Sequence, residues 1–87
     1  MNRAEEWRRR ARAEIQAIAR RDAGQARRIA EAVARYVAHD QGDVRKLAGQ
    51  DDIYRLRVGD WRVLFAFDDG GRTVVILRVL NRRDAYR

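Results

Sequence analysis

Arginines recur at alternate positions on both sides of one predicted turn, and their guanidinium groups are the side chains best placed for chemistry. The stretch 53–67 contains two runs in which apolar and basic residues alternate, separated by Gly59-Asp60. A two-residue loop that contains glycine is typical of a β-hairpin, and this register pairs Arg57 with Arg62. Because side chains alternate across a strand, one face of the hairpin is basic and holds Arg55, Arg57 and Arg62. The other face is apolar and holds Tyr54, Leu56, Val58, Trp61, Val63, Phe65 and Phe67.

The pairing of Arg57 with Arg62 has two interpretations. Like charges that face each other on a sheet destabilise it by a few tenths to about 1 kcal/mol. Either the arginine stems cover the sheet while their charged ends spread into water, or this face binds a polyanion. The whole chain favours a polyanion, because 20 basic residues against 13 acidic ones give a net charge of +7. Guanidinium groups also form paired hydrogen bonds to phosphate and stay charged at any accessible pH.

A third predicted strand brings more charge to the same place. Residues 73–80 are nearly all apolar and follow a turn at residues 68–71. If this strand is antiparallel to the second, residues 78–82 return beside Trp61 and Arg62. The segment that follows then adds basic and phenolic side chains to that edge. The predicted site therefore comprises Arg55, Arg57, Arg62, Arg82 and Tyr86, with Arg83 as a further member.

This set of side chains restricts the chemistry that it could perform. The chain has no cysteine and one histidine, His39, in a predicted loop, so we expect no metal and no cofactor. The aspartates near the hairpin fall in turns, where they have a conformational role. RNA cleavage needs little covalent participation by protein, since the 2′-hydroxyl of the RNA can attack the adjacent phosphate. Cations then position the chain and neutralise the developing charge.

Two amphipathic helices are expected to support this hairpin. Apolar residues recur every three or four positions from about Ala4 to Arg21 and again from Ile29 to Ala38, with a break at residues 22–25. Residues 44–49 could form one helical turn or an extended approach to the hairpin. We therefore predict an α+β fold in a single domain, residues 1–87. An N-terminal antiparallel helical hairpin packs on a small antiparallel sheet of at least three strands.

The charged outer faces of the helices and the N-terminus say less about function. The helix arginines could simply be solvated or could contact an RNA backbone. The N-terminal sequence has no apolar core typical of a signal peptide, and no run approaches the ~20 apolar residues of a membrane span. We expect a cytoplasmic protein that does not bind membranes.

Residues 54–65, preceded by 43–47 and followed by 80–87, resemble the RelE branch of the RelE/ParE toxin superfamily. The resemblance implies a RelE-like fold and a toxin of a bacterial type II toxin-antitoxin module. It further implies a metal-independent endoribonuclease that cuts mRNA in the ribosomal A site, with ribosome and mRNA as partners. A cognate antitoxin, acidic and with an amphipathic helix, would neutralise it, in a heterotetramer. By motif position, the catalytic residues would be Arg57, Arg62, Arg82 and Tyr86. The residues that bind RNA phosphates would be Arg45, Lys46, Arg55, Arg57 and Arg83.

The sequence departs from the family pattern at three places. Members often carry lysine where Arg55 and Arg57 stand, and arginine does not readily give up a proton, so Tyr86 becomes the candidate base or base-orienting group. Asn81 replaces a histidine or basic residue. Residues 1–10 lack alternation and indicate helix; without the family's opening strand, an exposed sheet edge would invite an antitoxin segment or a second copy. A ParE-like DNA gyrase poison and a non-catalytic module that binds RNA or antitoxin are the alternatives.

Overall fold

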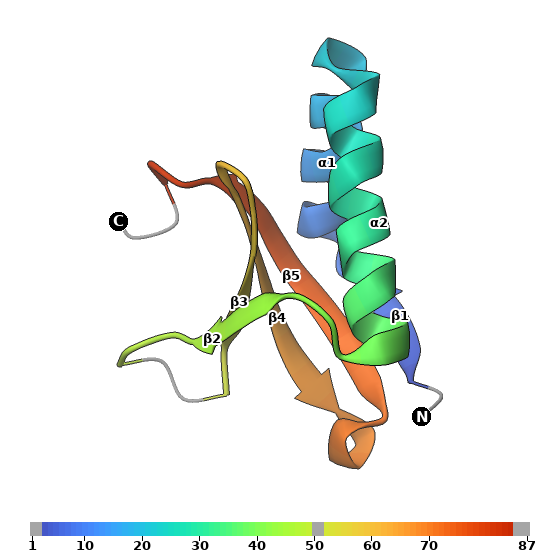
Figure 1. The fold of residues 1–87 in the computed structure, drawn as a ribbon, viewed down its shortest axis with the longest axis vertical. Coiled ribbons are helices and arrows are strands. Elements are labelled where there is room, and N and C mark those ends of the chain that lie inside the picture. Colours follow the sequence, from blue (N-terminus) through green and yellow to red (C-terminus); the bar gives the residue numbers. More distant parts are fainter. Residues whose placement is uncertain (1–2, 50–51, 85–87) are drawn as a thin grey trace.

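Two helices lie against one face of a five-stranded sheet in the computed structural model, which describes residues 3–49 and 52–84 (Figure 1). The elements follow in the order β1 Ala4–Trp7, α1 Arg9–Arg21, α2 Ala23–His39, β2 Asp43–Lys46, β3 Tyr54–Val58, β4 Trp61–Asp68, η1 Asp69–Gly71 and β5 Thr73–Asn81. The spatial order of the strands is β1-β5-β4-β3-β2. The predicted α+β architecture is confirmed. No helix in the described ranges is long and apolar enough to cross a membrane.

The β3–β4 hairpin has the register that the sequence predicts. Val58 pairs with Trp61, Arg57 with Arg62, and so on to Tyr54 with Phe65. Gly59 has a φ of 59°, a left-handed conformation that glycine adopts without the strain that a side chain would add. The turn therefore determines which side chains of both strands share a face.

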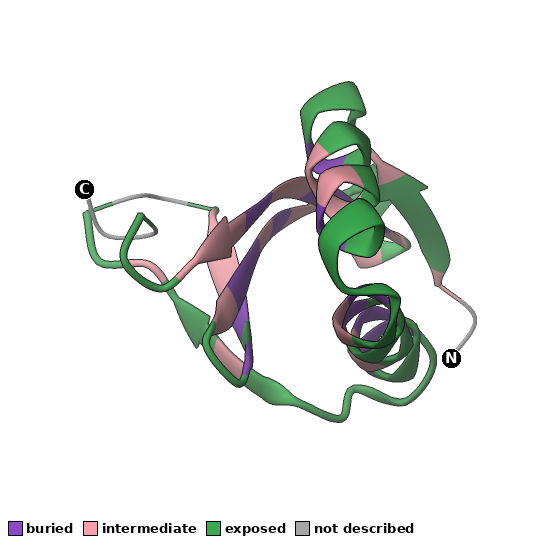
Figure 2. Cartoon of the chain, turned by 90° about the horizontal axis from the view of Figure 1, so that it is seen from above, coloured by how far each residue is buried: buried purple, intermediate pink, exposed green. Residues whose placement is uncertain are grey.

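The apolar face of this hairpin forms the floor of the core. Figure 2 shows the buried residues gathered where the helices meet the sheet, with exposed residues on the outer faces of the helices. Side chains that are less than 2% exposed come from both layers: Ile29 and Val33 from α2, Val63 and Phe65 from β4, and Val74 and Ile76 from β5. Each such side chain contributes about 1.5–3 kcal/mol by leaving water. The alanine-rich helices depend on this floor, because their own apolar stripes are narrow.

The break between the helices is a single residue. Asp22 ends α1 by donating its backbone N–H to Ile18 O at 2.7 Å, and its Oδ1 accepts from Gln25 N at 3.1 Å. An aspartate at this position caps the first turn of the next helix. The predicted connection at residues 22–25 is therefore shorter than expected, and α2 begins at Ala23. Of the two alternatives for residues 44–49, the extended one is correct, because β2 pairs with β3.

The N-terminal segment is a strand, so the prediction of helix from Ala4 is wrong. Residues 4–7 pair in parallel with residues 73–76 of β5, and Ala4 N donates to Arg72 O at 2.8 Å. The spacing of Ala4 and Trp7 fits a helical stripe, but pairing with an open edge satisfies the backbone of this segment instead. β1 thus occupies the edge that we expected to be exposed, and it adds a parallel strand to the predicted antiparallel sheet.

Arg3 fastens β1 to the end of α2. Its Nη2 donates to Tyr36 O and to Asp40 Oδ1, each at 2.6 Å, and its Nε donates to Val37 O at 3.1 Å. These carbonyls belong to the last turn of α2, where a cation also interacts well with the helix dipole. The guanidinium lies 4.9 Å from the centre of the Tyr36 ring. Burial raises the pKa of the Tyr36 hydroxyl, although the Arg3 charge opposes this effect.

β5 contains a bulge that explains its continuous apolar run. Leu64 pairs with Arg78 and Phe65 pairs with Ile76, so Leu77 is an extra residue in β5. One inserted residue reverses the alternation of the strand. As a result, Ile76 and Val79 both enter the core that the helices cover, although their spacing is odd.

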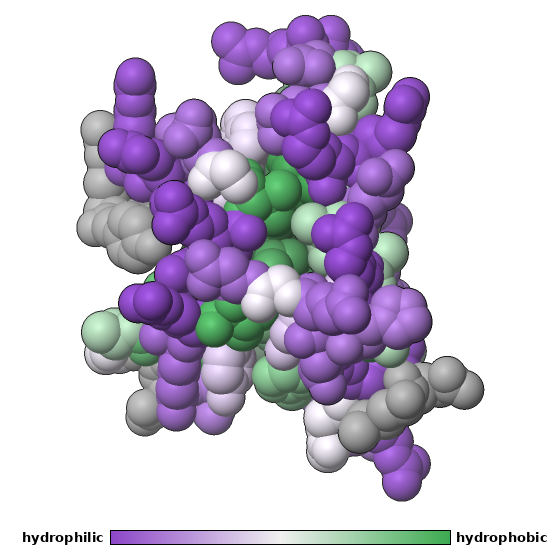
Figure 3. Space-filling model, in the orientation of Figure 1, coloured by the Kyte–Doolittle hydropathy of each residue, from purple (hydrophilic) through white to green (hydrophobic). Residues whose placement is uncertain are grey.

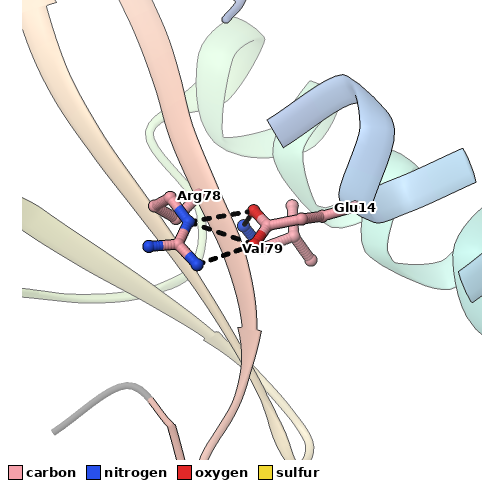
Figure 4. Close-up of polar contacts among 3 residues, drawn as sticks. All are labelled: Glu14, Arg78 and Val79. Atoms are coloured by element: carbon pink, nitrogen blue, oxygen red, sulfur yellow. Dashed lines mark hydrogen bonds and ion pairs between the residues drawn. The ribbon is translucent and has the colours of Figure 1, made fainter. Parts of the chain in front are cut away.

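A carboxylate from α1 closes the part of the β5 edge that lies beyond β1. β1 pairs with β5 only as far as Ile76. Further along, Glu14 Oε1 accepts from Val79 N at 2.8 Å, and the carboxylate also accepts from Nε and Nη2 of Arg78 at 2.8–3.2 Å (Figure 4). Both side chains are about one quarter exposed. Glu14 therefore replaces a strand at this edge and ties α1 to the sheet.

Replacing Glu14 by alanine is expected to lower the free energy of unfolding by about 1–3 kcal/mol, since it leaves a half-buried guanidinium and the Val79 N–H without their acceptor. Glu14→Gln keeps an acceptor for Val79 and should cost less. Urea denaturation measures both variants, and Glu31→Ala, on the exposed face of α2, is the control and should change stability by less than about 0.5 kcal/mol. Equal stability of Glu14→Ala and Glu31→Ala would contradict this role.

Candidate functional site

The arginines of the hairpin lie together on the side of the sheet that the helices leave open. Their partners across the strands show this: Arg57 pairs with Arg62, and Arg55 pairs with Leu64 of β4 and with Arg45 of β2. We call the set Arg45, Arg55, Arg57 and Arg62 the basic face. Lys46 pairs with Tyr54 and so belongs to the opposite, helix-covered side. The structure therefore brings four of the predicted cations together and separates Lys46 from them.

Arg62 differs from the other members because its side chain is buried. The residue is 7% exposed, and its Nη1 donates to Gly59 O at 2.8 Å and to Trp61 O at 3.0 Å. Among the described residues, its Nε has no hydrogen-bond partner. A buried N–H without an acceptor costs about 1–3 kcal/mol. Arg62 is thus held in place by the turn, and its buried Nε is a donor without an acceptor among the described residues.

The carboxylate of Asp43 and several backbone carbonyl groups offset the repulsion between the arginines. Asp43 pairs with Arg57 across β2 and β3, and its Oδ1 lies 3.4 Å from Arg55 Nη1. The Arg55 Nη1 also donates to Asp43 O at 3.1 Å. Two carbonyl oxygens accept hydrogen bonds from Arg62, and their partial negative charge weakens the repulsion between Arg62 and Arg57. Arg57 is exposed, so water also screens its charge. Sequence reasoning missed Asp43, whose place beside the arginines depends on the β2–β3 register.

The other predicted cations lie at the end of the sheet where β3 and β4 join. Arg82 N donates to Asp60 O at 2.8 Å, which fixes the end of β5 beside the hairpin turn. The Arg82 side chain is 65% exposed, and its Nη1 is 4.0 Å from Asp60 Oδ1, so this ion pair contributes little. A hollow of about 660 Å³ opens here, and we call it the turn hollow. Its lining residues are Arg21, Asp60, Asn81, Arg82, Arg83 and Asp84.

The turn hollow includes residues that the predicted site did not contain. Arg21 reaches it from the last turn of α1, and Asp60 from the hairpin turn. Arg21 could be found in the sequence only as one helix arginine among several. Tyr86, predicted as a catalytic residue, lies outside the described residues. The described part of the chain has no group of three or more His, Cys, Asp or Glu side chains suited to a metal.

The arginines of the described site form a cluster of cations that can bind a polyanion. The sheet supplies a buried, oriented guanidinium at Arg62 and an exposed one at Arg57. Arg82 and Arg83 add exposed cations beside the same turn. Such an arrangement can hold phosphate groups in a defined position and stabilise negative charge on their oxygens.

Comparison with known proteins identifies the class of protein to which this fold belongs. The family model for the ParE toxin of the type II toxin-antitoxin system parDE matches residues 6–86. The chain belongs to the RelE/ParE toxin superfamily. Two curated relatives from Methanocaldococcus jannaschii are similar to it: toxin RelE3 is 36% identical over 44 residues, and RelE1 is 29% identical over 51 residues. These alignments cover 51% and 59% of this chain and 48% and 57% of the relatives, so the chain spans about half the length of the curated relatives that it matches.

Solved structures share the fold along nearly the whole chain. One similar chain is from the crystal structure of the archaeal RelE-RelB complex from Pyrococcus horikoshii OT3, with a TM-score of 0.75 and 24% identity over 98% of this chain and 100% of that one. A YoeB/ParE toxin from Agrobacterium tumefaciens has a TM-score of 0.76 and 13% identity over 90% of this chain and 96% of that one. The predicted RelE-like fold is confirmed.

Arg45 and Lys46 are adjacent in β2 but lie on opposite faces of the sheet, so substituting each one tests whether the basic face binds RNA. Arg45→Ala should weaken the binding of a single-stranded oligonucleotide and lower the slope of log K against log salt by about 0.7, the share of one phosphate contact. Lys46→Ala should have the smaller effect, because its strand position faces the other side. Fluorescence anisotropy at several salt concentrations measures both. Equal losses in affinity and slope would mean that the charge of β2, rather than its basic face, attracts the oligonucleotide.

Proposed function

We propose that this chain is a ribosome-dependent mRNA endonuclease that needs no metal and is neutralised by a cognate antitoxin. The observation that carries the proposal is the buried Arg62 guanidinium. It is fixed by two carbonyl oxygens of the hairpin, has an unpartnered Nε, and pairs with Arg57 across the strands. Family membership and the resemblance to RelE toxins support the choice of RNA as the polyanion.

The proposed reaction uses the RNA's own nucleophile. The 2′-oxygen attacks the adjacent phosphorus while the bond from phosphorus to the 5′-oxygen breaks, which yields a 2′,3′-cyclic phosphate and a 5′-hydroxyl. A base takes the proton of the 2′-hydroxyl, and an acid returns a proton to the leaving oxygen. We assign charge stabilisation to Arg57, Arg62 and Arg82, and we assign one proton transfer to Tyr86, because arginine holds its protons too tightly. Arg45, Arg55 and Arg83 hold neighbouring phosphates.

In the proposed function, the ribosome positions the mRNA that the toxin cleaves. The exposed cations of the basic face and of the turn hollow would hold the mRNA backbone, while the ribosome presents one codon in the A site. Translation dependence follows if the ribosome, rather than this small chain, sets most of the geometry of the scissile phosphate. Codon choice is then shared between the ribosome and the toxin.

Arg57→Ala and Arg62→Ala should each lower the cleavage of translated mRNA by about 10²–10³-fold, as expected for loss of one preorganised donor. Arg57 is exposed, so its variant should keep the fold, whereas Arg62→Ala also loses contacts to the turn and needs a melting curve beside it. Primer extension during inducible expression, with and without an inhibitor of translation, locates the cuts. Arg72→Ala removes an exposed charge at the opposite end of β4 and should cut normally.

The same experiment separates the alternatives. Intact mRNA together with DNA breaks that depend on gyrase would replace the ribonuclease with a gyrase poison, a reading that the ParE description of the family model favours. Intact mRNA and DNA, with RNA binding retained, would leave a non-catalytic module. Tyr86→Phe tests the proton carrier: normal cleavage by this variant would remove Tyr86 from the mechanism.

The antitoxin is proposed from charge and from the neighbouring structures. The chain carries a net charge of +7, and similar folds were solved as RelE-RelB complexes from Pyrococcus horikoshii and Methanococcus jannaschii. We expect the adjacent reading frame to encode an acidic protein with an amphipathic helix. Co-expression should give a complex, a heterotetramer by light scattering, that survives size exclusion and prevents cleavage. Failure of the two proteins to copurify would argue for a solitary module.

A further inference from the structure

A second, smaller hollow lies beside the turn hollow and contains an aromatic side chain. Its volume is about 270 Å³, and we call it the Trp61 slot. The residues that line it come from both helices and from β4: Ala17, Ile18, Arg21, Asp22, Gln25 and Trp61. It lies in the seam between the helical layer and the sheet. Along this seam, apolar atoms are visible between hydrophilic rims in Figure 3.

The walls and the rim of the Trp61 slot differ in chemistry. The walls are apolar, with the half-buried Trp61, the helix residue Ala17 and Ile18, which is only 8% exposed. The rim is polar, with Arg21, Asp22 and Gln25 at the junction of the two helices. This combination suits a flat group with an aromatic face and a polar edge. A nucleobase has both, and stacking on an aromatic side chain tolerates any base.

Two hydrogen bonds hold residues of the polar rim. Asp22 accepts from Gln25 N at 3.1 Å, as the cap of α2, and the Gln25 Oε1 accepts from Arg28 Nη1 at 3.3 Å. The second contact orients the Gln25 amide, whose N–H groups are donors for a carbonyl or ring nitrogen of a base. A preorganised rim of this kind lowers the entropy cost of binding.

Arg21 connects the Trp61 slot with the cations of the turn hollow. It lines both hollows, and Trp61 follows Asp60, which lines the turn hollow, in the chain. A base in the slot would therefore have its phosphate near Arg21 and Arg82. Together the two hollows are lined by the arginines Arg21, Arg82 and Arg83, by the aspartates Asp22, Asp60 and Asp84, and by one aromatic side chain, Trp61.

We propose that the Trp61 slot binds the base of an RNA nucleotide that flanks the cleaved phosphate, with Arg21 on its backbone. This assignment rests on the proposed function, since it takes RNA as the ligand. An apolar side chain of a protein partner is the competing occupant. The observations favour the base, because the slot shares Arg21 with a hollow that Arg82 and Arg83 also line, and a nucleotide needs a cation for its phosphate beside an aromatic surface for its base.

The first test measures base-dependent binding without cleavage. Trp7→Phe leaves Trp61 as the single tryptophan of the chain, and Trp7 lies on β1 outside the slot. A 2′-O-methyl tetranucleotide, which lacks the nucleophile, should quench Trp61 fluorescence. Four further tetranucleotides each lack the base at a different position. One of the four should bind more weakly by roughly 5- to 150-fold, which corresponds to the loss of one stacked base, and the other three should bind normally. Equal binding and quenching by every abasic version would overturn the proposal.

The second test fills the slot without changing any charge. Ala17→Leu should weaken tetranucleotide binding and remove the difference between the intact and abasic versions, and Gln25→Ala should weaken binding less. Ala13→Leu, at an exposed position of the same helix, and Gln16→Ala are matched controls that should bind normally. If Ala17→Leu lowers antitoxin affinity and leaves RNA binding unchanged, the slot belongs to the protein partner and the proposal fails.

Mapping the cleavage positions distinguishes a failure of the Trp61 slot proposal from a failure of the proposed endonuclease function. With the function correct, Ala17→Leu should still cut translated mRNA in an Arg62-dependent manner, at altered positions or with lower efficiency. Unaltered positions and efficiency would overturn the slot and leave the endonuclease intact. Absence of any cleavage by the unmodified protein, together with base-dependent tetranucleotide binding, would overturn the endonuclease and retain the slot.

Discussion

The two-residue turn between β3 and β4 is the constraint on which the rest of the structure depends. Its backbone conformation needs the positive φ of Gly59, and its length fixes the register of both strands. The carbonyl oxygens of the turn then accept from two arginines: Gly59 O from the side chain of Arg62, and Asp60 O from the backbone of Arg82. One turn therefore sets the apolar floor of the core, orients the buried cation and anchors the end of β5.

The backbone groups along the outer edge of β5 are satisfied in two different ways. Over residues 73–76 a strand satisfies the backbone, and beyond them the carboxylate of Glu14 accepts from Val79 N and from Arg78. The bulge at Leu77 lies between these two parts of the strand. It lets the strand change its alternation while the helices still cover a continuous apolar surface. The strand edge, the bulge and the first helix thus meet along β5.

Local sequence rules predicted the central hairpin and the general architecture because the interactions involved are short in range. Alternation and the glycine turn determine the pairing of residues 54–65, and that register is confirmed in full. The helical periods gave the two helices, and the antiparallel return of β5 placed Leu80 and Asn81 beside Arg62 and Trp61 as expected. The same alternation placed Arg55, Arg57 and Arg62 on one face, whereas Arg45 joins them through the β2–β3 register. The roles of these arginines in catalysis stay a prediction.

The sequence by itself determined the hairpin register, the apolar floor and the sign of the charge on the open face, since each depends on spacing within a few residues. Only the tertiary structure decided that residues 4–7 form a strand, that Leu77 is a bulge, and that Arg21 and Trp61 share a hollow. It also decided that Arg62 is buried while Arg57 is exposed. The physical reason is that edge pairing, burial and hollows arise between segments distant in the chain, and periodicity carries no information about such contacts.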